Sequence, residues 1–404
     1  MANNHPGKIE NLKNKIRILV DGTDLINGIA CFSKKNLGND IKKLAVELSK
    51  NKSYQFDEIS AMFAYLDSIT YYGKHIRCFD QEETSCQDLQ PKEKDDLVDF
   101  SCNYLLSIPF SYEITIPLNN LSLPSFSDCK RFSIEHKIKS KASMGFALSG
   151  ESEVAQTNIC VPSIGYYNIY EKDYFMKEAT IVLNVLIYSL LAKKVIERNY
   201  NKSVQRTINW SPIFDRKQYI TELWAKIINN DYPQSIDEHS FSIPTAMYLE
   251  ELEMVSGMHE DELKNLTLEA LEEATRLLDD TSDEAQNIVS AIDWCIQSEI
   301  NHDKTMSFLQ ICMGLEALLG DNTNDAGLTL TLTDRCAYLI GKGMAERAEI
   351  KKEFKAIYQL RSKLVHGRMN KISTQDRALC IKAIKYLKRA ISKELSYLME
   401  KNER

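Results

Sequence analysis

The last third of this sequence repeats apolar residues at helical spacing in five successive segments, which leaves little room for strands there. In the second segment Phe308, Ile311, Leu315 and Leu318 fall on one helical face, and Gly320 stops the run. We expect the five helices over about 284–302, 305–319 and 331–340, over a segment that ends near residue 366, and over 374–400. The pattern predicts an all-α C-terminal bundle over residues 281–404.

The first 170 residues carry a different pattern. "YEITIPL" (112–118) and "FSIEHKIK" (132–139) are typical of strands, and "IRILVDGTDLI" (16–26) predicts a strand, an Asp-Gly turn and a second strand. We therefore expect a mixed α+β domain over residues 1–170.

Between these two regions strand signals become rare. Helical spacing predicts helices over about 173–199, 215–230, 245–256 and 260–279. The candidate N-caps of "DDTSDEA" (279–285) mark the next boundary. The chain as a whole is thus predicted to be α+β, with a helical middle region over 171–280.

Composition narrows the classes of function. A formal net charge of -7 argues against a protein that coats nucleic acid over its whole surface. The ten cysteines include no C-x-x-C pair, as expected for reduced, buried cysteines of a cytoplasmic protein. No secretory signal is visible at the start, and the apolar run 180–192, which contains Asn184, is too short for a bilayer, so we expect a core helix and no membrane association.

Charge is unevenly distributed in the C-terminal half. Residues 249–303 hold 16 acidic and 2 basic side chains, whereas residues 342–404 hold 17 basic and 7 acidic ones. On the last predicted helix, Lys382, Lys385, Arg389 and Lys393 follow one another at three- and four-residue steps and share a face. This face is either an ordinary solvated surface or one that attracts phosphates.

An arginine interrupts the apolar face of the fourth helix. In "EIKKEFKAIYQLRSKLVHG" the side chains of Ile350, Phe354, Ile357, Arg361 and Leu364 are spaced 4, 3, 4 and 3 residues apart. A guanidinium at such a position needs an anion, because it cannot lose its charge on burial. Glu316 in "GLEALLG" could supply it from within the chain, and a phosphate could supply it from outside; a surface or capping role for Glu316 is the competing interpretation.

A histidine follows at the predicted end of that helix. Gly367 can adopt the left-handed conformation that ends a helix, which would turn His366 toward the same cleft as Arg361. The simpler interpretation is a histidine that favours the helix dipole. Spacing alone decides nothing, because "RFSIEH" offers a second such pair, Arg131 and His136, on a predicted strand.

The order of three segments resembles a known family. "FLQICMGLEALLG", "LTLTDRCAYLIG" and "FKAIYQLRSKLVHG" resemble the HEPN domain, in particular the ApeA-like branch of bacterial anti-phage defence proteins, over about residues 285–400. The resemblance implies a metal-independent endoribonuclease, a hydrolase without cofactor that acts as a homodimer with two Arg/His pairs facing one cleft. It implies that Arg361 and His366 are catalytic.

The resemblance also assigns helpers and partners. Ser362 takes the place of a polar helper residue, and Glu316 is expected to orient Arg361. RNA, including tRNA, would be cut by attack of the 2′-hydroxyl, leaving 2′,3′-cyclic phosphate and 5′-hydroxyl ends. We expect phosphate contacts from the basic residues around the motif and on the last helix, namely Lys363, Arg368, Lys382, Lys385 and Arg389.

A toxic ribonuclease needs restraint, so residues 1–280 are interpreted as a sensor for a phage-protein trigger that releases RNA cleavage in abortive infection. The alternative is a non-catalytic HEPN-type module that dimerises or binds a nucleotide or RNA. A metal-dependent reading of Asp21 and Asp24 is disfavoured, since an Asp-Gly turn explains the same letters and no further carboxylates complete a site; no metal is expected.

Overall fold

The computed structural model describes residues 6–33, 37–50, 54–77, 83–141, 152–168, 170–200, 222–320 and 328–402. The protein is α+β, as predicted. Its contacts divide it into two compact units: one of residues 1–114, 162–177 and 226–239, the other of residues 115–161, 178–225 and 240–404. The boundaries predicted near residues 170 and 280 stay predictions, and each unit is described by itself.

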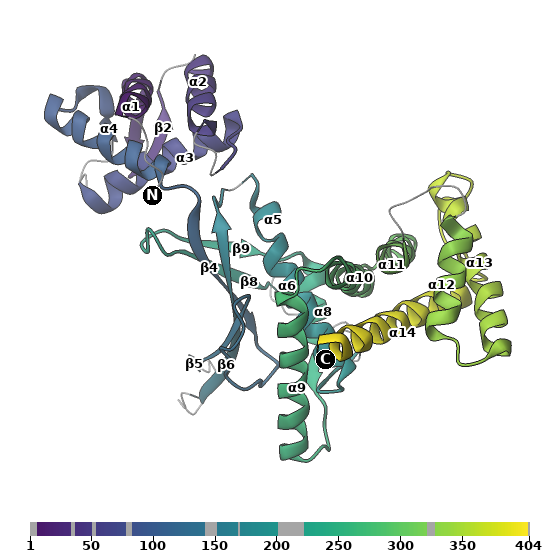
Figure 1. Cartoon of the computed structure of the whole chain (residues 1–404). Coiled ribbons are helices and arrows are strands. Elements are labelled where there is room, and N and C mark those ends of the chain that lie inside the picture. Colours follow the sequence, from purple (N-terminus) through teal and green to yellow (C-terminus); the bar gives the residue numbers. More distant parts are fainter. Residues whose placement is uncertain are drawn as a thin grey trace, which may run out of the picture. The chain divides into compact units, whose positions relative to one another are not determined.

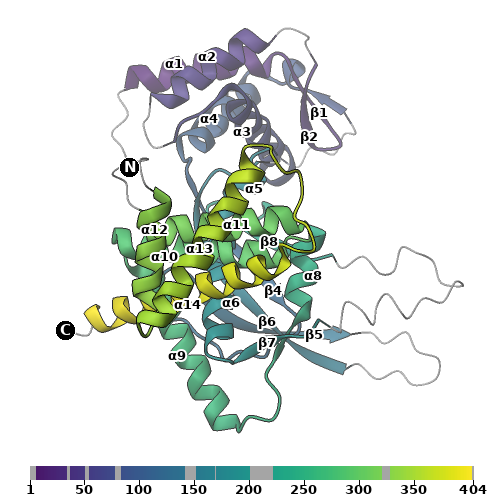
Figure 2. The ribbon, with the colours of Figure 1, turned by 90° about the vertical axis from the view of Figure 1, so that its right-hand side faces the viewer.

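The first unit places four helices around a small antiparallel sheet (Figures 1 and 2). The helices are α1 Pro6–Val20, α2 Gly38–Ser49, α3 Glu58–Tyr71, which continues into the π-helix η1 Tyr72–Ile76, and α4 Pro91–Leu106. The sheet has the order β2-β1-β3, with β1 Thr23–Ile26, β2 Ile29–Phe32 and β3 Glu83–Ser85, and the 3-10 turn η2 Cys86–Asp88 follows. The core of this unit is apolar, with Leu12, Ile16 and Leu44 fully covered.

The predicted hairpin at residues 16–26 is wrong in its first half. Residues 16–20 form the C-terminal end of helix α1, and Ile16, Leu19 and Val20 lie on its buried face. The hairpin lies one strand later, where Ile26 pairs with Ile29 and both Asn27 (φ 50°) and Gly28 (φ 74°) take the left-handed conformation. Asn-Gly is a preferred sequence for a two-residue hairpin turn. Asp21-Gly22 instead follows the end of helix α1.

Both strands predicted around residues 112–118 and 132–139 are confirmed. They belong to a five-stranded sheet of order β5-β6-β4-β8-β9. Its strands are β4 Phe110–Leu118, β5 Ser133–Lys141, β6 Ser152–Gly165, β8 Trp224–Asn229 and β9 Ile236–Ser240. Ser133 pairs with Cys160 and Lys141 with Ser152 in the antiparallel β5–β6 ribbon.

The region 171–280 contains strands that the sequence did not lead us to expect. The helix predicted over 215–230 is wrong at its described residues, since 224–229 form β8; residues 215–221 lie outside the described residues. In β8 burial alternates, with Ala225 and Ile227 covered and Trp224 exposed, which is the period of a strand. The ends of two other predicted helices are also strands, β7 Ile196–Arg198 and β10 Leu252–Met254, which pair with each other. The described helices of this region are α5 Lys172–Phe175, α6 Lys177–Ala192, α8 Ile243–Glu251 and α9 Glu260–Asp279.

The C-terminal helical region matches the predicted segments to within a few residues. Its helices are α10 Asp283–Ile300, α11 Lys304–Leu319, α12 Leu328–Ile340, α13 Met344–Val365 and α14 Arg377–Asn402 (Figure 1). Ser282, in the predicted N-cap segment, accepts the Ala285 N–H at 3.2 Å, and Asp303 accepts the Thr305 N–H at 2.7 Å. Local capping therefore fixes where α10 and α11 begin.

The apolar run 180–192 is a core helix, as predicted, within α6 Lys177–Ala192. It packs with the C-terminal helices: Asn184 donates to the Asp293 carboxylate of α10 at 2.7 Å, and the Tyr188 hydroxyl donates to the Lys388 carbonyl of α14 at 3.3 Å. None of the described helices is long and apolar enough to cross a membrane.

Candidate functional site

The arginine of α13 follows directly on a buried face. Ile350, Phe354 and Ile357 are at most 2% exposed, and Arg361 continues their line one turn later with one third of its side chain exposed. The predicted helical face is confirmed. Because the apolar residues point into the helical region, Arg361 is held at its edge, where a guanidinium can meet both a protein carboxylate and a dissolved anion.

Glu316 provides the internal anion. Its Oε2 lies 3.3 Å from a terminal guanidinium nitrogen of Arg361, and three quarters of the Glu316 side chain is covered. This contact replaces the competing interpretation of Glu316 as a surface or capping residue. A guanidinium has five N–H donors, and within the described residues one hydrogen bond, to Glu316, engages them.

A Schellman motif ends α13. Gly367 is left-handed (φ 67°), as predicted, its N–H donates to the Leu364 carbonyl at 3.2 Å, and the Arg368 N–H donates to the Lys363 carbonyl at 2.9 Å. His366 occupies the C-cap and is exposed. The turn thus presents the imidazole to solvent directly after the last helical residue.

The structure brings together some of the predicted site residues and not others. Arg361 and Glu316 form a pair, whereas in the described part of the chain no hydrogen bond or ion pair joins His366 to either of them. Ser362 is exposed, and its carbonyl accepts the His366 N–H at 3.1 Å. A cleft that holds the arginine and the histidine together is therefore an expectation for the RNA complex or the dimer.

The predicted phosphate-binding residues differ in their availability. Lys363, Arg368 and Lys385 are exposed, and their side chains contact no carboxylate among the residues the structure describes. Lys382 instead pairs with Glu353, and Arg389 donates to the Ile340 carbonyl at 2.6 Å and to Glu346 at 2.8 Å. These two cations already hold α14 to α13 and to the end of α12.

Sequence reasoning missed a polar group beside the pair. Tyr358 lies one turn before Arg361 on α13 and is buried, and its hydroxyl has no hydrogen-bond partner within the described structure. Burial, followed by the nearby Glu316 carboxylate, raises the pKa of Tyr358, while Arg361 acts in the opposite direction. Cys312, one turn before Glu316, is likewise buried, and burial raises the pKa of its thiol. The only sequence signal was the position of Tyr358 three residues before Arg361.

The sequence also offered Asp21 and Asp24 as metal ligands and Arg131 and His136 as a second Arg/His pair. Asp21 pairs with Lys94, and Asp24 accepts the Ser85 hydroxyl at 2.8 Å. No group of three or more metal-ligating side chains occurs among the described residues. Arg131, of the second Arg/His pair, contacts Glu178 at 3.0 Å, whereas His136 lies on β5.

Comparisons with known proteins found no match to this chain among protein-family models, curated proteins or solved structures.

Proposed function

We propose that this chain is a metal-independent endoribonuclease of HEPN type whose catalytic residues are Arg361 and His366. The observation that carries the proposal is the Arg361–Glu316 pair at the edge of the helical region, one turn before an exposed histidine. The carboxylate orients the guanidinium, and the remaining N–H donors are free to meet a phosphate.

The chemistry follows from the two side chains. Arg361 stabilises the negative charge that develops on the phosphate as it becomes five-coordinate. His366 takes the proton of the ribose 2′-hydroxyl or gives one to the leaving 5′-oxygen. The 2′-oxygen forms the new bond to phosphorus while the bond to the 5′-oxygen breaks, which leaves a 2′,3′-cyclic phosphate and a 5′-hydroxyl. DNA lacks the nucleophile and stays intact.

A homodimer would bring an arginine and a histidine to one cleft. No contact joins His366 to Arg361 within the described residues, so a second copy or the RNA itself must complete the cleft. Exposed apolar side chains on α11, Met306 and Met313, lie on the same helix as Glu316 and offer a surface for such a partner.

The test is incubation of tRNA and total RNA with the purified full-length protein in EDTA, beside Arg361→Ala and His366→Ala, with analysis of the product ends. We expect cleavage by the wild type alone, with cyclic phosphate ends. Arg131→Ala is the matched control, because it also removes one arginine from a carboxylate pair. Cleavage that survives His366→Ala would overturn the assignment.

The second candidate is a non-catalytic HEPN-type module that dimerises or binds a nucleotide or RNA. It is favoured by the exposed cations Lys363, Arg368 and Lys385, which can bind phosphates without any cleavage. RNA binding without cleavage by a purified dimer would support it.

The biological role follows from the proposed activity. We propose cytoplasmic anti-phage defence by abortive infection, in which a phage protein engages residues 1–280 and releases the toxic cleavage. Expression of the wild type should protect cells from phage or stop their growth, and His366→Ala should abolish both effects. Protection that persists in that variant would contradict this role.

A further inference from the structure

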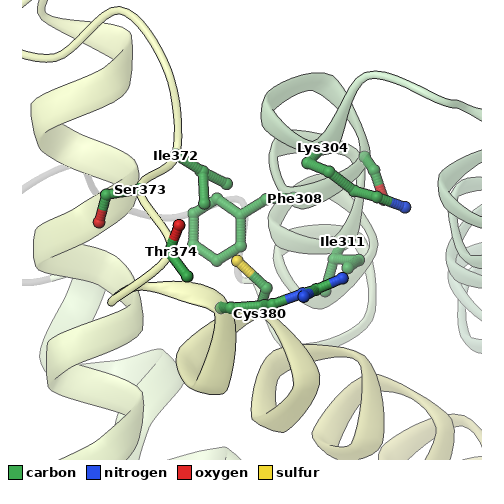
Figure 3. A pocket seen from close by; sticks show the side chains of 9 residues that line it. Lys304, Phe308, Ile311, Ile372, Ser373, Thr374 and Cys380 are labelled. Carbon is green, nitrogen blue, oxygen red and sulfur yellow. The ribbon is translucent and has the colours of Figure 1, made fainter.

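A cavity of about 220 Å³ lies between the first turns of α11 and α14 and the loop that precedes α14. Its lining combines apolar, hydroxyl and cationic side chains: Phe308, Ile311, Ile372 and Cys380, then Ser307, Ser373 and Thr374, and finally Lys304 and Arg377. Figure 3 shows the Phe308 ring between Ile372 of the loop and the sulfur of Cys380. We call this cavity the Phe308 pocket.

The loop that forms one wall begins at the proposed catalytic histidine. It runs from His366 to Asp376, between α13 and α14. The Ile372 N–H donates to the Thr305 hydroxyl of α11 at 3.2 Å, which fastens the loop to that helix. The same short segment therefore carries His366 at one end and closes the Phe308 pocket at the other.

Helix α11 connects the pocket with the arginine pair. Ile311 lines the pocket and Glu316, which holds Arg361, follows five residues later, a rise of about 7.5 Å along the helix axis. The pocket and the proposed reaction centre thus share helix α11, although the five-residue step also turns Glu316 by about 140° around the helix axis from Ile311.

The two cations of the pocket are available to an anion. Lys304 and Arg377 are exposed and form no ion pair within the described part of the chain. The backbone donors at the two helix starts are already used: Asp303 accepts the Thr305 and Met306 N–H groups, and the Asp376 N–H donates to the Ser373 hydroxyl. A bound anion would therefore be held by the two side chains and not by the helix ends.

The size of the cavity limits the ligand. About 220 Å³ is below the volume of common drug-sized sites, so it takes one small group. An apolar floor beside two cations suits a flat ring that carries a phosphate, because the ring packs on apolar and aromatic atoms while the guanidinium meets phosphate oxygens.

We propose that the Phe308 pocket holds one nucleotide of a single-stranded RNA substrate, with its base against Phe308, Ile372 and Cys380 and its phosphate at Arg377 and Lys304. This assignment rests on the proposed function. The hydroxyls of Ser307, Ser373 and Thr374 also line the pocket and offer hydrogen-bonding groups to the edge of the base.

The test measures binding of ribonucleoside 5′- and 3′-monophosphates, and of a 2′-O-methyl RNA that cannot be cut by 2′-hydroxyl attack, to the full-length protein. We expect Lys304→Ala/Arg377→Ala to weaken binding of both probes at least tenfold and to reduce the salt dependence, since each lost phosphate contact lowers the logarithmic slope by about 0.7 for a single strand. Lys264→Ala, which removes one exposed cation from helix α9, outside the basic C-terminal end, should change the affinity less than twofold.

Four outcomes test the pocket and the proposed function separately. If the wild type cleaves RNA, the double variant should raise KM and leave kcat at saturating RNA within about twofold. Cleavage with an unchanged KM, together with unchanged nucleotide affinity, would overturn the pocket and leave the ribonuclease intact. Loss of nucleotide binding in the double variant of a protein that cuts no RNA would support the pocket without supporting the ribonuclease. Inorganic phosphate that binds as tightly as the nucleotides would overturn the role of the apolar floor.

Discussion

Glu316 Oε2 lies 3.3 Å from a terminal nitrogen of Arg361 and joins the last turn of α11 to the last turns of α13. The pair is partly exposed, so its contribution to the free energy of unfolding is about 0–1 kcal/mol. In the proposed function its role is to orient the guanidinium of Arg361. This separation of stability from activity can be measured.

Arg361→Lys should lower RNA cleavage by about 10²–10³-fold, because an ammonium lacks the planar fork that meets a phosphate. The same change should alter the free energy of unfolding by less than about 1 kcal/mol. Parallel denaturant unfolding and cleavage assays give both numbers. Equal losses of stability and activity would show that the pair is merely structural.

Gly367→Ala should destabilise the end of α13 by about 1 kcal/mol, because a Cβ is disfavoured at φ 67°. It should also reduce cleavage through His366, which the turn presents. Gly38→Ala at the start of α2 is the control: no atom lies within 4 Å of its added Cβ. Thermal unfolding of both variants checks the expectation, and an equal response at the two glycines would contradict it.

Tyr358→Phe should leave stability unchanged or raise it by about 1 kcal/mol, since it removes a buried hydroxyl that has no partner in the described structure. Tyr386→Phe is the matched opposite, because the Tyr386 hydroxyl donates to Glu353 and its loss should destabilise by about 1–3 kcal/mol. Urea unfolding distinguishes them. A destabilised Tyr358→Phe would mean that the hydroxyl has a partner in solution.

Asp67→Asn should remove a pH dependence of stability. Burial raises the pKa of Asp67 to about 6, although the hydrogen bond from Tyr166 acts in the opposite direction. Between about pH 4 and 6 the folded protein therefore holds a proton that the unfolded chain, with an ordinary carboxyl pKa near ~3.9, has lost. The contribution of this group to stability must fall as the pH rises through that window and stay constant above it.

Unfolding midpoints between pH 4 and 8 measure this slope in the wild type and in Asp67→Asn. The exposed Asp128→Asn carries the same charge change and serves as the control. An identical slope in the wild type and Asp67→Asn would refute the assignment to Asp67.

The sequence predicted the C-terminal helices well because their signals are local. Apolar spacing and caps such as Ser282 and Gly367 act within one or two turns. The partner of Arg361 was also predictable, because a charge on a buried face requires an anion and Glu316 stood on a neighbouring helix. The sequence did not reveal that Lys382 and Arg389 are engaged in ion pairs and so less available to a phosphate. Their partners Glu353 and Glu346 are determined by how α13 packs on α14.

The strands of the middle region escaped prediction for a related reason. β7 and β10 have three residues each and pair across more than 50 positions of sequence, so neither carries a period of its own. In the first unit the Asn27-Gly28 turn was overlooked in favour of Asp21-Gly22. A helix ending at Val20 could have been recognised only from burial by α2 and α4, which the sequence does not display.

The contacts of α6 with α10 and α14 bear on how such an enzyme could be switched. Asn184 and Tyr188 of α6 bond to α10 and α14, so α6 is packed directly on two helices of the C-terminal region. Suppose that α6 and helices α10–α14 change together between two conformations. A trigger that binds one conformation more tightly shifts the equilibrium toward it by the difference in binding free energy. RNA that prefers one conformation then changes the affinity for the trigger by the same factor. Restraint and activity would then reflect one conformational equilibrium, and its coupling could be measured as the effect of the trigger on RNA affinity or of RNA on trigger affinity.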